Sequence, residues 1–499
     1  MRRRARVRLL LVLCLPLLAA GAWFLACGRA SDSEASREPC GVAACDASVS
    51  PESAEESDGG DTSALPKDSS APVSDAGRDA RPLAPCDDGG VPGALDPSFG
   101  EGGVVYFSNV GGGAVLIQPD GRTVLSSGGR DGHLTLGRLT PAGGLDTSFG
   151  DGGIVATPIP WGKVGAVQSL ALTGDGRILA AGYATPDGGP FDWAIGRYSA
   201  GGALDGTFGD AGFKYVTFGP TEGCWLPSLA MTPDGHILAA GWTRGYGTSA
   251  AADYLILKLN PDGSPDTTFG TGGTVRVDIR SQDLAFAIVV QPDGKILVAG
   301  SSHPVLPTTP PTFGPEGLSA IRLHPDGSLD PSFGSAGKVF LTLPTESGAR
   351  DVALDAAGRI ILGGWIRGRF GNQELAVFRL TSTGALDTTF GAGGLANTDF
   401  DAGDIVLDQG LYVQPDGKYL LTGVARPTGP KDALLRFLPD GAPDPGFGTG
   451  GTVVVPNPAD FYVRSHAAAF RGDRAVLVGQ WVPNFLVGQL WSGASRYCL

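Results

Sequence analysis

Short runs of alternating apolar and polar residues, separated by glycine-containing turns, fill the chain from about residue 95 to its end. In IVVQPDGKILVAG, which begins at Ile288, two such runs flank a Pro-Asp-Gly turn. Alternation with a period of two predicts strands, and a Pro-Asp-Gly turn between two strands predicts an antiparallel hairpin. No long helical stripe of apolar residues follows residue 26, so we expect an all-β fold.

The hairpin pattern recurs seven times, and it alternates with a second phrase of the form Leu/Pro-Asp-x-x-Phe-Gly. The phenylalanines of this phrase are 50 to 64 residues apart: Phe99, Phe149, Phe208, Phe269, Phe333, Phe390 and Phe447. A third apolar run follows the hairpins and a fourth follows the phrases, which gives four short strands per period. Four antiparallel strands in a period of this length are typical of a propeller blade, so we expect a seven-bladed β-propeller.

The two ends of the repeat region are complementary. The last unit ends after its third strand, whereas the first phrase, Leu95 to Phe107, has no hairpin before it. We therefore expect the N-terminal strand to complete the last blade as its outer strand. Cys86 precedes this strand and Cys498 follows the third strand of the same blade, so we expect a disulfide between them that locks the ring. Cys224 has no obvious partner in the sequence, and we expect a buried thiol.

The N-terminal segment has the features of an export signal. Five arginines lie within Met1 to Arg8, and Leu9 to Ala26 is almost wholly apolar. The stretch ends in Phe24-Leu25-Ala26-Cys27, which resembles a bacterial lipobox, so we expect residues 1–27 to be a lipoprotein signal and Cys27 to be lipidated. Simple cleavage and an uncleaved anchor are the alternatives.

Residues 28–85 differ in composition from the repeats that follow. They are mostly Ser, Ala, Asp, Glu, Gly and Pro without an aromatic residue, so we expect a disordered acidic linker before a propeller that spans residues 86–499. Cys40 and Cys45 lie in this linker and can form a local loop, or one of them can pair with Cys86. We expect an exported monomer, held on the outer membrane or cell surface only by its lipid anchor, or else periplasmic or extracellular.

Charge and motifs exclude several functions. The net charge is -14 and no basic stripe occurs, which argues against a nucleic-acid partner. The aspartate of the phrase occurs in all seven units, as expected of a turn cap rather than a catalytic residue. The histidines have no metal-ligand spacing, and no nucleophile elbow, phosphate loop or HExxH motif occurs. We therefore predict no catalytic residue, metal or cofactor.

The repeated phrases resemble those of a known family. The LD-x-S-F-G phrase followed by Gly-Gly, the VQPDGKI-LVAG hairpin and the ALxRL strand are similar to the delta-60 repeat, a bacterial export-associated repeat, over Leu95 to Leu499. This resemblance implies a propeller-like array, often found on surface proteins. It implies no activity, catalytic residue or cofactor.

The variable turns offer the best candidate for a binding surface. In a four-stranded antiparallel blade, the turns between second and third strands share one rim with the crossovers, and here they vary in length and composition. Aromatic residues with arginine are common anchors of recognition. The predicted binding rim consists of Trp161, Tyr183, Trp225, Trp242, Arg244, Trp365, Arg367 and Trp481. We expect the protein to be a scaffold for a protein or glycan partner. The alternatives are a propeller enzyme (a hydrolase, lyase or quinoprotein) and a purely structural envelope protein. For the rim itself, the alternative is that its tryptophans only cover loops and blade edges.

Overall fold

The structure is a computed structural model, and the residues that it describes all belong to one compact unit, Gly77–Leu499. It describes residues 92–499 except for 108–111, 128–132, 160–162, 186–190, 218–221, 246–251, 307, 309–311, 369–370, 399–404, 407–409, 426–430, 455–460 and 484–490. Cys27, Cys40, Cys45 and Cys86 therefore lie outside the described residues, as do the predicted signal and the whole of the predicted linker.

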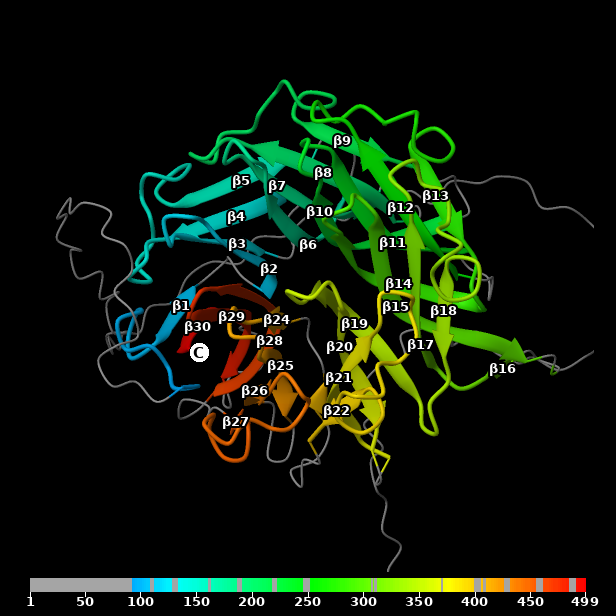
Figure 1. The fold of residues 1–499 in the computed structure, drawn as a ribbon. Helices are drawn as coiled ribbons and strands as arrows, with labels where there is room; N and C mark the ends of the chain where they lie inside the picture. Colours follow the sequence, from blue (N-terminus) through cyan, green and yellow to red (C-terminus); the bar gives the residue numbers. More distant parts are fainter. Residues whose placement is uncertain are drawn as a thin grey trace, which may run out of the picture. The chain divides into compact units, whose positions relative to one another are not determined.

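The described residues contain strands and turns but no helix, and the strands pair in the order of the chain (Figure 1). The first two sheets are made of β2 (Gly112–Ile117), β3 (Thr123–Ser127), β4 (His133–Leu139) and β5 (Ile154–Pro158), and of β6 (Lys163–Leu172), β7 (Ile178–Thr185), β8 (Asp192–Tyr198) and β9 (Phe213–Val216). All pairs within these two sheets are antiparallel, because each strand runs back beside the one that precedes it in the chain.

The next two repeat units form one sheet instead of two. The first unit contains β10 (Glu222–Met231), β11 (Ile237–Gly245), β12 (Ala252–Leu259) and β13 (Thr274–Val277), and the second contains β14 (Ser281–Val290), β15 (Ile296–Leu306), β16 (Thr312–Phe313), β17 (Gly317–Leu323) and β18 (Lys338–Leu341). A single parallel bridge between Ala252 and Gln282 joins them into a nine-stranded sheet. The sequence predicts two separate blades here, and it contains no signal for this bridge.

Three further sheets complete the described chain. Their strands are β19 (Ser347–Leu354), β20 (Ile360–Arg367), β21 (Gln373–Leu380) and β22 (Leu395–Asn397); β23 (Ile405–Val406), β24 (Leu411–Val413), β25 (Tyr419–Ala425), β26 (Lys431–Phe437) and β27 (Thr452–Val454); and β28 (Phe461–Arg471), β29 (Arg474–Pro483) and β30 (Trp491–Cys498) with β1 (Val104–Phe107). In the last sheet β1 pairs antiparallel with β30, for example Val104 with Ser495. A strand from the start of the described chain thus supplies the outer strand of the C-terminal sheet.

The repeated phrase forms a turn whose three defining residues have the roles that the sequence predicts. In the fifth copy Asp330 Oδ1 accepts the backbone N–H of Ser332 at 3.0 Å, which caps the turn. Gly334 has φ of +55°, and a Cβ there would lie 2.2 Å from the carbonyl oxygen of Lys338. Phe333 is fully buried, as are the other six phenylalanines of the phrase.

A cation from the third strand completes each turn. Its guanidinium or ammonium group lies 2.7 to 2.9 Å from the aspartate of the phrase, and we call this arrangement the cation–aspartate clasp. The seven pairs are Arg138–Asp146, Arg197–Asp205, Lys258–Asp266, Arg322–Asp330, Arg379–Asp387, Arg436–Asp444 and Arg496–Asp96. The same cation lies over the ring of the buried phenylalanine, at 4.7 Å for Arg322 and Phe333.

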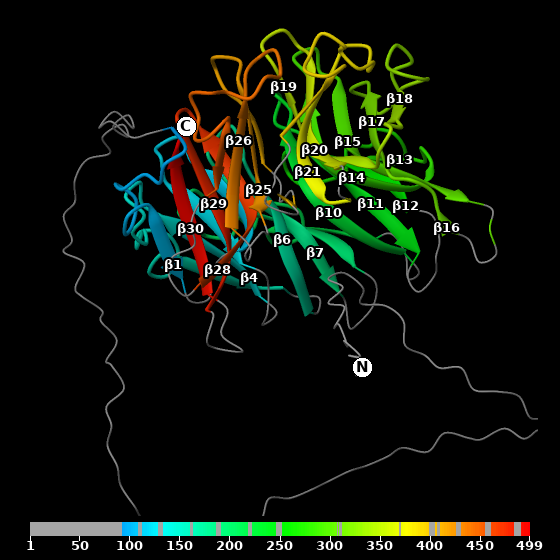
Figure 2. The same ribbon diagram turned by 90° about the horizontal axis from the view of Figure 1, so that it is seen from below.

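The clasps also join neighbouring sheets. In six of them the cation donates to a backbone carbonyl in the turn of the following unit, as Arg379 does to Pro439 at 2.7 Å. Arg496, in the last sheet, donates in this way to Pro141 in the turn after β4. Antiparallel four-stranded units that repeat in chain order and are joined at equivalent turns define a β-propeller (Figures 1 and 2).

We expect the clasp to be a major source of stability, and Asp330→Asn tests this. Asp330 and Arg322 are 2% and 5% exposed, so removing the carboxylate leaves a buried guanidinium unpaired and lowers the free energy of unfolding by about 3–5 kcal/mol at pH 7. The control is Asp293→Asn, which removes an exposed pair with Lys295 and costs less than about 1 kcal/mol. Equal losses for the two variants in urea unfolding would contradict this role.

The same variant has a defined pH dependence. Burial by itself raises the pKa of Asp330, but hydrogen bonds from Ser332 and the charge of Arg322 outweigh it and lower the pKa to about 2. Because the folded state holds the proton less tightly, the stabilisation is complete above about pH 4 and is lost as the pH falls toward 2. The difference between the wild type and Asp330→Asn therefore shrinks across this window.

Candidate binding site

The first strands of six units surround one cavity. Its volume is about 170 Å³, and its lining comes from β2, β6, β10, β14, β19 and β28. This is about the liquid volume of five to six water molecules and less than the pocket of a drug-sized ligand. The cavity therefore fits a small molecule or one protruding group of a larger partner.

Each of these six strands contains a β-bulge at an equivalent place. The register shifts between Gly112 and Val115 in β2, and again near the middle of β6, β10, β14, β19 and β28. A bulge leaves a residue out of the ladder and redirects its side chain. In β14 and β19 the residues left out are Phe286 and Arg350, and both line the cavity.

Phe286 and Arg350 contact each other across neighbouring units. The guanidinium carbon of Arg350 lies 3.8 Å from the centre of the Phe286 ring, which is a close cation–π contact. Gln168, Ser169 and Ser228 add polar groups to the lining. The cavity thus combines one cation, one aromatic ring and several neutral hydrogen-bonding groups.

Asp351 is the carboxylate of the cavity, and the backbone holds it in place. Its Oδ1 accepts the N–H of Val352 and its Oδ2 accepts the N–H of Leu411 in β24, both at 2.8 Å. Burial raises the pKa of Asp351 to about 6, against these two hydrogen bonds. Asp351 therefore joins two neighbouring units and places a carboxyl with a raised pKa beside Arg350.

A series of half-buried aromatic rings leads to this cavity. Ring centres are 4.8 Å apart for Tyr183 and Phe191, 5.3 Å for Phe191 and Trp225, 5.7 Å for Trp225 and Trp242, and 5.1 Å for Trp242 and Phe286. The two tryptophans are stacked, with 10° between their planes. The series crosses from the second sheet through β10 and β11 to β14, so three repeat units contribute to one surface.

The structure places the predicted rim residues in two different settings. Tyr183, Trp225 and Trp242 come together in the aromatic series. Trp365 in β20 is 3% exposed and packs over Gly348, so the described surface does not present it. Arg367 is exposed and pairs with Glu346, with Nε 2.7 Å from Oε2.

The structure does not describe the side chains of three predicted rim residues. Trp161 lies outside the described residues, and for Arg244 in β11 and Trp481 in β29 only the backbone is described. Cys224, by contrast, is fully buried, as predicted.

The sequence interpretation missed Phe191, Phe286 and Arg350. A signal for two of them exists in the repeats, because Phe286 and Arg350 each lie eight residues before the glycine of the following hairpin turn. The same position holds Gly113, Gln168, Pro227 and Gln409 in other units. The residue type at this position differs between units, and in the first five units it coincides with the bulge.

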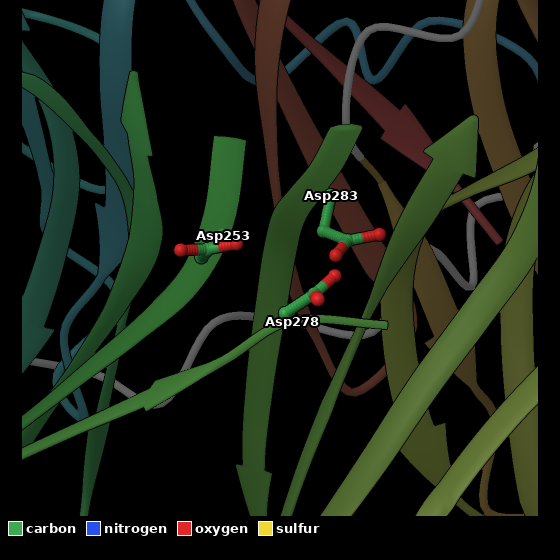
Figure 3. A group of neighbouring side chains, drawn as sticks. All are labelled: Asp253, Asp278 and Asp283. Carbon is green, nitrogen blue, oxygen red and sulfur yellow. The ribbon is translucent and has the colours of Figure 1, made fainter. Parts of the chain in front are cut away.

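One acidic group lies apart from the cavity lining. Oxygen atoms of Asp253, Asp278 and Asp283 lie within 4.8 Å of one another (Figure 3). Asp283 accepts the N–H of Ile279 at 2.5 Å, and Asp253 pairs with Arg276 at 2.5 Å. These bonds account for the positions of two carboxylates, so we assign the group a structural role where β12 lies beside the turn between β13 and β14.

Five segments of the chain match the model of one family, described as a domain of unknown function (DUF5122) beta-propeller: residues 173–208, 232–269, 291–333, 358–390 and 414–447. Each segment runs from a hairpin turn to the phenylalanine of the next phrase. The repeats are therefore similar to a β-propeller repeat family, and the more specific delta-60 name stays a prediction. No curated protein matches the chain.

Solved structures with similar folds are distant in sequence. A protein of unknown function from Dyadobacter fermentans DSM 18053 is 12% identical, with 66% of this chain and 94% of that chain covered and a TM-score of 0.39. The puromycin-hydrolyzing peptidase of Mycobacterium tuberculosis is 10% identical, with 80% and 54% covered and a TM-score of 0.45. The Nup133 beta-propeller domain of Vanderwaltozyma polyspora is 8% identical, with 79% of this chain and 100% of that chain covered and a TM-score of 0.36. None of these similarities supports a functional inference.

Among the described residues, no helix is both long and apolar enough to span a membrane.

Burial separates Trp365 from Trp242 and predicts different effects of the two alanine substitutions. Trp365→Ala removes a buried ring and lowers the free energy of unfolding by about 3–5 kcal/mol. Trp242→Ala removes a half-buried ring, and we expect a clearly smaller loss. Urea unfolding of both variants measures the difference, and an equal or larger loss for Trp242→Ala would assign the aromatic series to the core.

Proposed function

We propose that this chain is an exported, lipid-anchored, seven-bladed β-propeller that acts as a binding scaffold for a protein or glycan partner at the cell envelope. The observation that carries the binding role is the aromatic series that ends at Phe286 and Arg350 in the cavity. Large aromatic faces beside a guanidinium are the usual chemistry of recognition anchors. The seven copies of the clasp supply the rigid support that such a surface needs.

Four contacts support the closed ring of seven blades. β1 pairs with β30, Arg496 binds Asp96, Arg496 also donates to Pro141, and the N–H of Gly100 donates to Ala142 at 2.8 Å. The sheet that contains the C-terminus therefore contacts the turn after β4 through bonds of the kind that join five other units to their successors. With the nine-stranded sheet counted as two blades, this arrangement gives seven.

A disulfide between Cys86 and Cys498 belongs to the same proposal. Cys498 is 5% exposed, its N–H donates to Ala94 at 3.0 Å, and its carbonyl accepts the N–H of Gly93 at 2.7 Å. Cys86 lies seven residues before Gly93 in the sequence, a stretch that spans at most about 25 Å. A bond here would add covalent closure to the strand pairing, hydrogen bonds and ion pair that already join these segments.

An enzyme remains the second candidate, because one observation favours it. Arg350 and Asp351 occur together in the cavity, and the equivalent positions of the other described units do not repeat this pair. A carboxyl with a pKa of about 6 suits general acid–base chemistry. Both Asp351 oxygens already accept backbone hydrogen bonds, however, and this favours a structural carboxylate and a binding site.

Retention of envelope components on the immobilised protein tests the binding role. Trp242→Ala and Arg350→Gln remove a ring and a cation from the site, and each reduces retention at least about tenfold. Arg367→Gln is the matched control, since it removes an exposed arginine outside the aromatic series, and it leaves retention unchanged. If all three variants retain partners as the wild type does while their unfolding curves stay normal, the site has no binding role.

The lipid anchor has a separate test. Cys27→Ser removes the only nucleophile of the lipobox-like sequence, so we expect it to abolish incorporation of labelled fatty acid and to release a processed chain from membranes. Metabolic labelling and membrane fractionation measure both effects. A wild-type protein that carries no lipid would contradict the anchor and leave the binding proposal intact.

A further inference from the structure

The hairpin formed by β15 and β16 extends beyond the sheet to which β15 belongs. β15 pairs with β17 from Ile296 to Ser302, and it then continues to Leu306 with β16 as its partner. The pairs in this extension are Val305 with Phe313 and Leu306 with Thr312. Figures 1 and 2 both show β16 projecting from the neighbouring strands.

The extension gathers exposed apolar side chains. Among the described residues five large hydrophobic side chains are exposed, and three of them lie here: Val305 (37%), Leu306 (39%) and Phe313 (51%). Exposed apolar residues that cluster in one projecting element mark a contact surface, whereas scattered ones do not. The other two, Tyr106 and Leu145, lie in separate units.

The sequence of the extension has no charge and few hydrogen-bond donors. No residue from Pro304 to Pro315 is charged, although the chain has a net charge of -14. Five of these twelve residues are prolines, which have no N–H and disfavour pairing with the strand of another protein. The N–H of Gly314 donates to Pro304 at 2.7 Å, and the hydroxyls of Thr308 and Thr312 bind each other at 2.9 Å. What the hairpin offers a partner is therefore non-directional apolar contact.

The proposed lipid anchor gives this surface an occupant, and the inference rests on that part of the proposed function. The predicted linker between Cys27 and the propeller has 58 residues, 28–85. A flexible chain of that length has a mean span of about 40–45 Å. An anchored propeller would thus stay within reach of the bilayer at high effective concentration. A charge-neutral apolar tip suits zwitterionic lipid, whereas the acidic chain is repelled by anionic lipid.

We infer that the β15–β16 hairpin is a second membrane contact, which places Val305, Leu306 and Phe313 in the interface of a zwitterionic bilayer. A single weak lipid signal gives reversible binding, and a second contact makes attachment stable. The hairpin is also a turn between second and third strands, so its insertion orients the variable rim toward the membrane surface. The propeller would then bind the partner of its aromatic series at the membrane surface.

Vesicle sedimentation tests the contact without the anchor. The mature chain from Gly28 onward is exported behind a signal that has no lipobox cysteine, and it is mixed with phosphatidylcholine vesicles. We expect Leu306→Glu/Phe313→Glu to reduce the fraction that sediments at least about tenfold, because two apolar side chains that would insert into the bilayer become charged. Tyr106→Glu, at a residue of β1 that is 37% exposed, sediments like the wild type.

Three results would overturn the inference. The first is that the folded wild type does not bind vesicles. The second is that the double variant binds vesicles as well as the wild type does. The third is that the double variant loses retention of an envelope protein but still binds vesicles. Circular dichroism of each variant shows that the fold is intact. Because the tested chain carries no lipid, the outcome is independent of lipidation at Cys27, and failure of the anchor is distinguished by the labelling experiment.

Discussion

The clasp between a third-strand cation and the aspartate of the repeated phrase is the interaction on which the rest of the fold depends. Each clasp brings together a capped turn and a buried phenylalanine, and in six of the seven the cation also donates to a carbonyl of the next unit. A buried ion pair stabilises a protein only when its remaining hydrogen-bonding groups are satisfied. In the fifth copy Ser332, two residues after the aspartate, and the carbonyl of Ser382 satisfy them, and five of the other six copies also have serine or threonine at the position of Ser332. The residues of the phrase are therefore constrained as a set, which explains why they recur together.

This constraint leaves a different part of each unit free to vary. The bulge in the first strand lies away from the phrase, and the residue there makes no contribution to the clasp. Different units accordingly hold glycine, glutamine, proline, phenylalanine and arginine at this position. Phe286 and Arg350 meet only because consecutive units place their first strands side by side around one cavity. The repeated clasp residues thus form the rigid scaffold, and the residues that differ between units determine the chemistry of the site.

The two surfaces proposed to be functional differ in physical character. The aromatic series is half-buried, rigid and next to a cation, which suits a directional contact with a protein or glycan. The β15–β16 hairpin is exposed, uncharged and poor in donors, which suits contact with lipid. Both belong to the variable rim, so one end of the propeller combines the features expected of a protein that works close to a membrane.

The sequence by itself determined the strand order, the turn chemistry and the propeller class, because each depends on local patterns that recur in every unit. Asp330 as a cap, Phe333 as a buried ring and Gly334 in the left-handed region all follow from their immediate neighbours. Tertiary structure alone decided which aromatic residues share a surface. Trp242 and Trp365 occupy equivalent positions within a second strand, yet Trp242 stacks on Trp225 whereas Trp365 is buried over Gly348. Each ring lies opposite a residue of its own hairpin that is 17 positions earlier, and Trp242 also contacts Phe286 of the next unit, 44 positions later. The pairing of the strands and the packing of neighbouring units bring these side chains together, and no local pattern specifies those contacts.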